Sequence, residues 1–238
     1  MRLFAAVQPP ADVLAHVEHA LDAVRGPDED AGGPGPLRWA ARDDRHITLA
    51  FFGEVSAGAA EQLEHGLAAV AAEHRPFRAQ LRGAGVFDRR VFWIGVGGDA
   101  DVLSGLTGAC VDLGDAVTGR TDSRVRSRSH LTVARVRSQA RARRPYRRRE
   151  AVPAGPDRVA ALAHALAVYA GPEWTVDSFA LLSSRPGEGR GGGPLYETEA
   201  TYRLGGGAAP EAAHPAGADG TEQGDGTEWS ARRAERRP

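Results

Sequence analysis

Two segments of the chain, at residues 46–49 and 130–133, share the order histidine, apolar residue, threonine, apolar residue. They read HITL and HLTV, and each begins a run of apolar and β-branched residues that is typical of a strand. Successive side chains of a strand point to opposite faces, so the histidine and threonine of each motif share one face. Each strand therefore presents an imidazole beside a hydroxyl, while its apolar face anchors it in a core.

The same succession of elements surrounds both motifs. Apolar residues at helical spacing alternate with short apolar runs. The first half predicts strands at 3–7, 45–52 and 77–81 and helices at 13–24 and 63–71. The second half predicts strands at 91–96, 130–136, 174–182 and 196–204 and helices at 102–117 and 159–166. The two histidines lie 84 residues apart, which exceeds the period of a solenoid repeat. The order instead favours a duplicated lobe, with the two motif strands facing one cleft.

Composition separates a globular part from a tail. Of the 238 residues, 42% are hydrophobic and 26% are charged, as in an ordinary globular protein. Beyond residue 204, Trp229 is the one large apolar side chain in a Gly-, Ala-, Glu- and Arg-rich segment. Such a segment cannot bury enough surface to offset its ordering entropy. We expect one domain over residues 1–204 and a disordered tail over residues 205–238.

Charge and cysteine usage narrow the cellular setting. The net charge is -1, so any attraction for phosphate must be local. Cys110 is the single cysteine, which excludes an intramolecular disulfide and gives no indication of an oxidising compartment. The apolar run at the N-terminus ends at Pro9 and Pro10, too early for a signal-peptide core, and no apolar stretch is long enough to span a membrane. We expect a cytoplasmic protein.

Paired histidines and threonines suit the cleavage of a phosphate ester. Histidine titrates near neutrality, so one imidazole can accept a proton from water while an imidazolium protonates the departing alkoxide. The Thr48 and Thr132 hydroxyls can donate hydrogen bonds to the phosphate oxygens. A 2′,3′-cyclic phosphate is strained and carries its own leaving group, so this chemistry requires neither a metal nor a cofactor.

Paired histidines can also be structural residues or metal ligands. Either His46 or His130 alone is more simply a hydrogen-bonded structural residue, and only the pair with its threonines indicates catalysis. A zinc site needs three or four close ligands, and neither motif has a neighbouring Cys, Asp or Glu at ligand spacing. We therefore predict no metal site.

The sequence resembles the RNA 2′,3′-cyclic phosphodiesterases, also called 2′–5′ RNA ligases, of the two-histidine phosphoesterase superfamily. The likeness covers about residues 1–204. It runs through RLFAAV at 2–7, HITLAFFGEV at 46–55, VFW at 91–93, SHLTVAR at 129–135, and the stretch from Phe179 to Tyr196. It implies an α+β fold of two pseudo-symmetric lobes, each an antiparallel sheet with helices on its outer face, flanking a central active-site groove.

The resemblance also implies roles for individual residues. His46 is implied as the proton donor to the leaving 3′ oxygen and His130 as the proton acceptor from water. Thr48, Thr132 and Arg135 are implied as phosphate ligands, and Phe51 and Arg135 as neighbours of the base. Strand alternation alone would place Phe51 and Arg135 opposite the histidines, so both roles require a bulge or a strand end.

The expected function is metal-independent hydrolysis of RNA 2′,3′-cyclic phosphate ends to 2′-phosphomonoesters by a monomer. RNA 3′ termini, such as those of tRNA fragments, or cyclic nucleotides are the expected substrates. The first alternative is an ATP-independent 2′–5′ RNA ligase or 2′–5′ phosphodiesterase that uses the same residues. The second is a non-catalytic RNA-binding module built on the arginines of residues 135–149.

Overall fold

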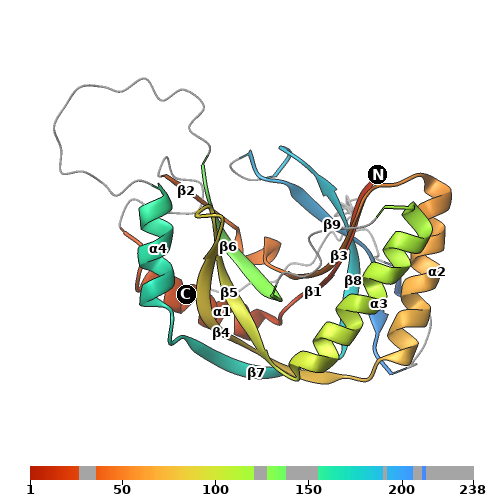
Figure 1. Ribbon diagram of the computed structural model, residues 1–238, viewed down its shortest axis with the longest axis horizontal. Helices are drawn as coiled ribbons and strands as arrows, with labels where there is room; N and C mark the ends of the chain where they lie inside the picture. Colours follow the sequence, from red (N-terminus) through yellow and green to blue (C-terminus); the bar gives the residue numbers. More distant parts are fainter. Residues whose placement is uncertain (27–35, 121–127, 138–154, 190–191, 206–210, 213–238) are drawn as a thin grey trace, which may run out of the picture.

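The backbone of the computed structural model forms one antiparallel sheet that curls around a concave face (Figure 1). The structure describes residues 1–26, 36–120, 128–137, 155–189, 192–205 and 211–212. The strands are β1 (Arg2–Val7), β2 (Leu37–Trp39), β3 (Ile47–Glu54), β4 (Phe77–Phe87), β5 (Val91–Gly98), β6 (His130–Val136), β7 (Ala170–Val176), β8 (Ser178–Arg185), β9 (Leu195–Arg203) and β10 (Glu211–Ala212). Their order in the sheet is β10-β9-β8-β1-β3-β6-β5-β4-β7, and β2 pairs with β6 off this path.

The sheet divides into two lobes related by an approximate internal repeat. Lobe 1 has the order β9-β8-β1-β3 and lobe 2 has the order β7-β4-β5-β6, so that β3 and β6 are equivalent and meet at the centre. Within this junction, the one residue pair is Ile47 opposite Leu131. The expected α+β fold with two pseudo-symmetric antiparallel lobes is confirmed.

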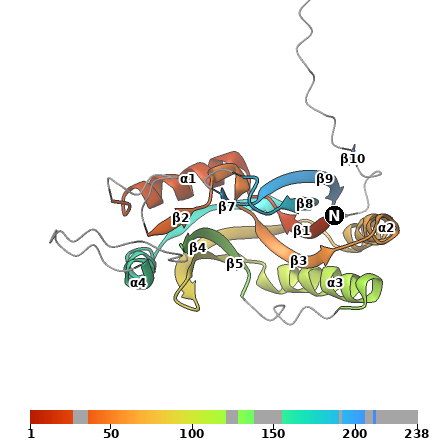
Figure 2. The ribbon, with the colours of Figure 1, turned by 90° about the horizontal axis from the view of Figure 1, so that it is seen from above.

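The helices cover the outer faces of the lobes, and each lobe receives a helix from the other (Figures 1 and 2). Helices α2 (Ala57–Glu73) and α3 (Ala100–Thr118) pack against each other, and α3 also packs on β3 of lobe 1. Helix α1 (Ala11–Asp22) packs on β7 of lobe 2, and helix α4 (Gly155–Ala165) packs on β4, β5 and β6 of the same lobe. Thus α1 follows a strand of lobe 1 but covers lobe 2, and α3 follows a strand of lobe 2 but covers lobe 1.

The structure changes the predicted elements in three places. The single strand expected at 174–182 is two strands, β7 and β8, because the chain leaves lobe 2 at Asp177 and enters lobe 1. The predicted halves differ from the lobes, since β4 lies in lobe 2. The strand expected at 45–52 begins only at Ile47, after a short 3₁₀-helix, η1 (Arg42–Asp44).

Most of the predicted tail lies outside the described residues. Of this segment, Gly205 is described, and the two residues of β10 pair with β9. No helix in the described part of the chain is long and apolar enough to cross a membrane.

Candidate active site

The two motif histidines are held by the same local hydrogen bond. The Nδ1 of His46 lies 2.8 Å from the carbonyl oxygen of Asp44, and the Nδ1 of His130 lies 2.9 Å from that of Arg128. A carbonyl oxygen can only accept, so Nδ1 carries the hydrogen in both rings. The Nε2 of each neutral imidazole is therefore the basic nitrogen, on the side of the ring away from its own backbone.

The central strand pairing brings the two motifs together in opposite directions. Because Ile47 lies opposite Leu131 in an antiparallel pair, His46 falls opposite Thr132, and Thr48 falls opposite His130. All four side chains are on the face that Ile47 and Leu131 do not use. The two imidazoles and two hydroxyls that the sequence singled out are thus neighbours across the junction of the lobes.

A bulge in each motif strand supplies the change of face that Phe51 and Arg135 require. The register of β3 against β1 slips after Thr48, and Leu49 is the extra residue. The register of β6 against β5 slips after Thr132, where Val133 is the extra residue. Each extra residue reverses the alternation of side chains. Phe51 and Arg135 consequently face the same side of the sheet as the histidines.

Aromatic rings from its own lobe surround each histidine. The ring centroid of His46 lies 4.9 Å from that of Phe4 and 5.0 Å from that of Tyr196. His130 lies 4.8 Å from Phe87 and 6.2 Å from Trp93. These four rings carry no signal in the sequence as site residues, because their approach to the motifs depends on strand register rather than on any local pattern.

Burial lowers the pKa of both imidazoles. It brings the pKa of His46 to about 4; the hydrogen bond to Asp44 opposes this shift, and the charges of Arg135 and His130 add to it. Burial also lowers the pKa of His130. The hydrogen bond to the Arg128 carbonyl opposes this shift, and the charge of Arg135 adds to it. Both rings are therefore neutral at pH 7 in the unliganded protein.

A buried ion network holds the segment that carries His46. Arg45 is 3% exposed and pairs with Glu18 of α1, which also pairs with Arg25. Burial alone would raise the pKa of the Glu18 carboxyl, but the two guanidinium groups outweigh it and lower that pKa. The Arg25 guanidinium in turn lies 4.3 Å above the ring of Trp39. Helix α1, which covers lobe 2, thus fixes Arg45, and Arg45 is the residue that precedes His46 at the start of the lobe-1 motif.

Arginine provides the positive charge of the site. Arg135 is exposed and lies opposite Arg38 of β2 in the sheet. Although Arg135 is exposed as a residue, partial desolvation of its guanidinium group lowers its pKa; the charge of Tyr196 opposes this shift, and Arg38 adds to it. Two cations and two neutral imidazoles on one face suit an anionic ligand.

Cys110, the question of a metal site and the arginine-rich stretch remain from the sequence. Burial raises the pKa of the Cys110 thiol to about 12, so this thiol is an unreactive core group. Within the described ranges, no three His, Cys, Asp or Glu side chains are grouped as metal ligands would be. Residues 138–149 of the arginine-rich stretch lie outside the described residues.

Comparisons with known proteins agree with this architecture. The chain is 37% identical over 114 residues to an RNA 2′,3′-cyclic phosphodiesterase of Geobacillus stearothermophilus, covering 44% of this chain and 35% of that protein. It is 43% identical over 72 residues to an RNA 2′,3′-cyclic phosphodiesterase of Aeropyrum pernix, covering 29% of this chain and 40% of that one. These matches thus span less than half the length of either relative.

A solved structure and a sequence profile extend the likeness. The structure of E. coli LigT complexed with 3′-AMP has a TM-score of 0.58 at 22% identity and covers 85% of this chain and 96% of that one, which shows a shared fold. The profile of the 2′-5′ RNA ligase superfamily matches residues 9–188, which include both motifs. Since this match extends over most of the length of this chain, the chain belongs to the 2′-5′ RNA ligase superfamily.

Proposed function

We propose that this protein hydrolyses RNA 2′,3′-cyclic phosphate ends to 2′-phosphomonoesters without a metal ion, with His46 and His130 as its acid–base pair. The observation that carries the proposal is the antiparallel pairing of Ile47 with Leu131, which makes the two motifs neighbours on one face. The names of the relatives from Geobacillus and Aeropyrum support the substrate class.

The proposed step is an in-line displacement at phosphorus. A water oxygen attacks the phosphorus while the Nε2 of neutral His130 takes the water proton. The bond from phosphorus to the 3′ oxygen breaks, and that oxygen takes a proton from the Nε2 of protonated His46. The product is a 2′-phosphomonoester with a free 3′-hydroxyl, and solvent exchange returns both rings to their starting states.

The bound phosphate would itself raise the pKa of His46, the proposed proton donor. His46 must be protonated to donate, although burial keeps its pKa at about 4 in the unliganded protein. A bound phosphate anion favours the imidazolium and raises that pKa. Thr48 and Thr132, from opposite lobes, would donate hydrogen bonds to the non-bridging oxygens, and Arg135 would add a positive charge.

The base would lie beside Phe51 and Arg135. Phe51 is 44% exposed, which is unusual for a large apolar side chain, and its ring centroid lies 5.7 Å from that of Phe4. An exposed ring offers a stacking surface that accepts any base. LigT, which shares this fold, is solved with 3′-AMP and supports a nucleotide in the site.

The same residues could act on a 2′–5′ linkage: an alcohol in place of water as the nucleophile forms that linkage, and by microscopic reversibility the same groups cleave it. Incubation of the protein with an oligonucleotide ending in a 2′,3′-cyclic phosphate, with EDTA present, addresses both reactions. We expect a 2′-phosphate end as the product. Joined ends without ATP would instead indicate the ligase direction, and activity only after metal addition would contradict the proposal.

Single substitutions test the histidine pair. His46→Ala and His130→Ala should each lower kcat by about 10²–10⁴-fold, the usual contribution of a positioned proton donor or acceptor. His65→Ala is the matched control, since His65, at an exposed position of α2, makes the same kind of bond to a carbonyl, that of Glu61. Unchanged turnover in either motif variant would contradict the acid–base pair. A wild-type protein that binds RNA without turnover, with an RNA affinity that neither histidine variant changes, would favour the non-catalytic RNA-binding module.

A further inference from the structure

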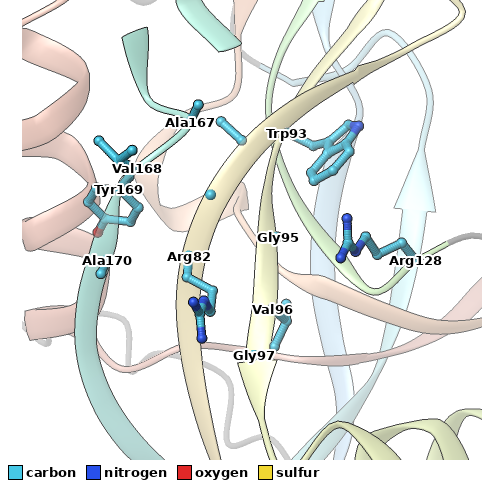
Figure 3. Close-up of a pocket in the computed structure, with 12 residues that line it drawn as sticks. Arg82, Trp93, Gly95, Val96, Gly97, Arg128, Ala167, Val168, Tyr169 and Ala170 are labelled. Carbon is cyan, nitrogen blue, oxygen red and sulfur yellow. The ribbon is translucent and has the colours of Figure 1, made fainter. Parts of the chain in front are cut away.

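A second concavity begins next to His130 and extends across lobe 2. It has a volume of about 510 Å³, and its lining includes Arg82, Trp93, Gly95, Gly97 and Arg128 (Figure 3). Gly95 lies directly opposite His130 in the sheet, and Trp93 lies opposite Thr132. Residues in direct register face the same side. The pocket therefore opens on the face that carries the catalytic motifs.

Glycines keep the floor of this pocket at the level of the backbone. A Cβ atom at Gly97 would lie 2.5 Å from the Cδ of Arg82, and one at Gly95 would lie 2.9 Å from the Arg82 carbonyl oxygen. Both distances are shorter than van der Waals contact. The stem of Arg82 can lie over Gly97 only because no side chain rises there.

The charge of the pocket suits an anion. Arg82 lies on one side of the β5 backbone and Arg128 on the other (Figure 3). No Asp or Glu lines the pocket, and across the described residues no carboxylate pairs with either guanidinium. Trp93 adds an indole to the lining. A volume of this size accommodates a ligand as large as a nucleotide.

The position of the pocket relative to the reaction identifies its occupant. In an in-line displacement the attacking and leaving oxygens lie on opposite sides of the phosphorus. Under the function proposed above, on which this step rests, His130 serves the attacking oxygen, and the aromatic wall around His46 lies on the other side. Whatever is attached to the attacking oxygen must therefore extend past His130 toward Gly95. Water has no such attachment, whereas the 5′-hydroxyl of an RNA does.

We propose that this pocket binds the nucleotide attached to the attacking oxygen, with Arg82 holding its next phosphate. The 5′ oxygen attacks phosphorus as His130 takes its proton, and the 3′ oxygen leaves with a proton from His46, which forms a 2′–5′ phosphodiester. In the reverse direction the 3′-hydroxyl attacks as His46 takes its proton. The 5′ oxygen then leaves with a proton from His130.

Two substrates separate the pocket from the rest of the site. Adenosine 2′,3′-cyclic phosphate needs no ligand in the pocket, whereas a 2′–5′-linked triadenylate cleaved at its first linkage must fill it. In Arg82→Gln, which retains the stem over Gly97, kcat/KM for the triadenylate should fall by about 10–100-fold through loss of one charged hydrogen bond. For the cyclic nucleotide it should stay within about twofold.

A second variant and a control complete the test. Val168 lines the pocket and is 93% exposed, so Val168→Glu adds a repelling charge without disturbing the core and should lower triadenylate cleavage selectively. Arg203→Gln, at an exposed position of β9, should change neither rate.

Equal loss on both substrates, or no loss in either pocket variant, would overturn the proposal. So would wild-type protein that cleaves only the cyclic nucleotide, a result that leaves the proposed function standing. Failure on both substrates would overturn both proposals.

Discussion

His46 and His130 have alike surroundings, although the proposed reaction gives them opposite tasks. The same kind of backbone bond fixes the tautomer of each ring, and aromatic neighbours partly bury each ring. These features make two neutral bases, which suits His130 in the proposed step. They do not make an acid, so the proton on His46 has to be stabilised by the bound phosphate.

This dependence on phosphate predicts different pH profiles for kcat/KM and kcat. The kcat/KM profile reports the free enzyme, in which burial lowers the pKa of both histidines, so its maximum should lie below pH 6.5, the ordinary histidine value. The kcat profile reports the complex, in which the phosphate anion raises both pKa values, and its maximum should lie at higher pH. Initial rates on a cyclic nucleotide between pH 4 and 9 measure both. A kcat maximum at lower pH than the kcat/KM maximum would contradict this account.

At the scale of elements, the bulges in β3 and β6 decide which side chains reach the site. An extra residue at Leu49 reverses the alternation, so Phe51 is exposed on the concave face while Phe52 is 2% exposed. Phe52 packs toward α3, where a Cβ atom at Gly114 would lie 2.8 Å from its ring. The two neighbouring phenylalanines thus lie on opposite faces: Phe51 at the exposed surface that is proposed to stack on the base, and Phe52 in the core.

Alanine at these two positions should therefore have opposite consequences. Phe51→Ala should raise KM for a cyclic nucleotide by about 5–160-fold, the effect of about 1–3 kcal/mol of base stacking, with little change in stability. Phe52→Ala should lower the free energy of unfolding by about 3–5 kcal/mol through the cavity it leaves. Steady-state kinetics and urea unfolding of both proteins separate the effects. A destabilised Phe51→Ala with normal KM would mean that the bulge does not reverse the strand.

The sequence predicted these elements only as far as local periodicity extends. The motif strands were found because apolar residues alternate with His46, Thr48 and their counterparts. A bulge adds one residue without changing composition, so Leu49 and Val133 gave no signal, and only resemblance pointed to Phe51 and Arg135. The break at Asp177 was missed for a similar reason, since one residue separates β7 from β8 although they lie in different lobes.

At the scale of the whole molecule, the site exists only where the lobes meet. The strands that carry the motifs pair at Ile47 and Leu131, while Phe4 and Tyr196 come from β1 and β9 on one side and Phe87 and Trp93 from β4 and β5 on the other. These aromatic neighbours could not be predicted, because they depend on the register of strands distant in sequence. The exchange of α1 and α3 between lobes and the pairing of Arg45 with Glu18 hold the lobes in this arrangement.

An anion bound by both motifs would join the lobes and should stabilise the whole fold. At about 100 times its Kd, inorganic phosphate should add about 2.7 kcal/mol, or about 5–10 °C in Tm for a domain of this size. Thr48→Val and Thr132→Val each remove one hydroxyl from one lobe, and each should weaken binding by about tenfold and halve the shift. Thermal unfolding with increasing phosphate measures all three proteins, with Thr175→Val at an exposed position of β7 as the control. If only one of the two motif variants lost part of the shift, the anion would be held by a single lobe. Since the proposed displacement needs ligands from both lobes on one phosphate, that result would leave the acid and the base without a shared substrate.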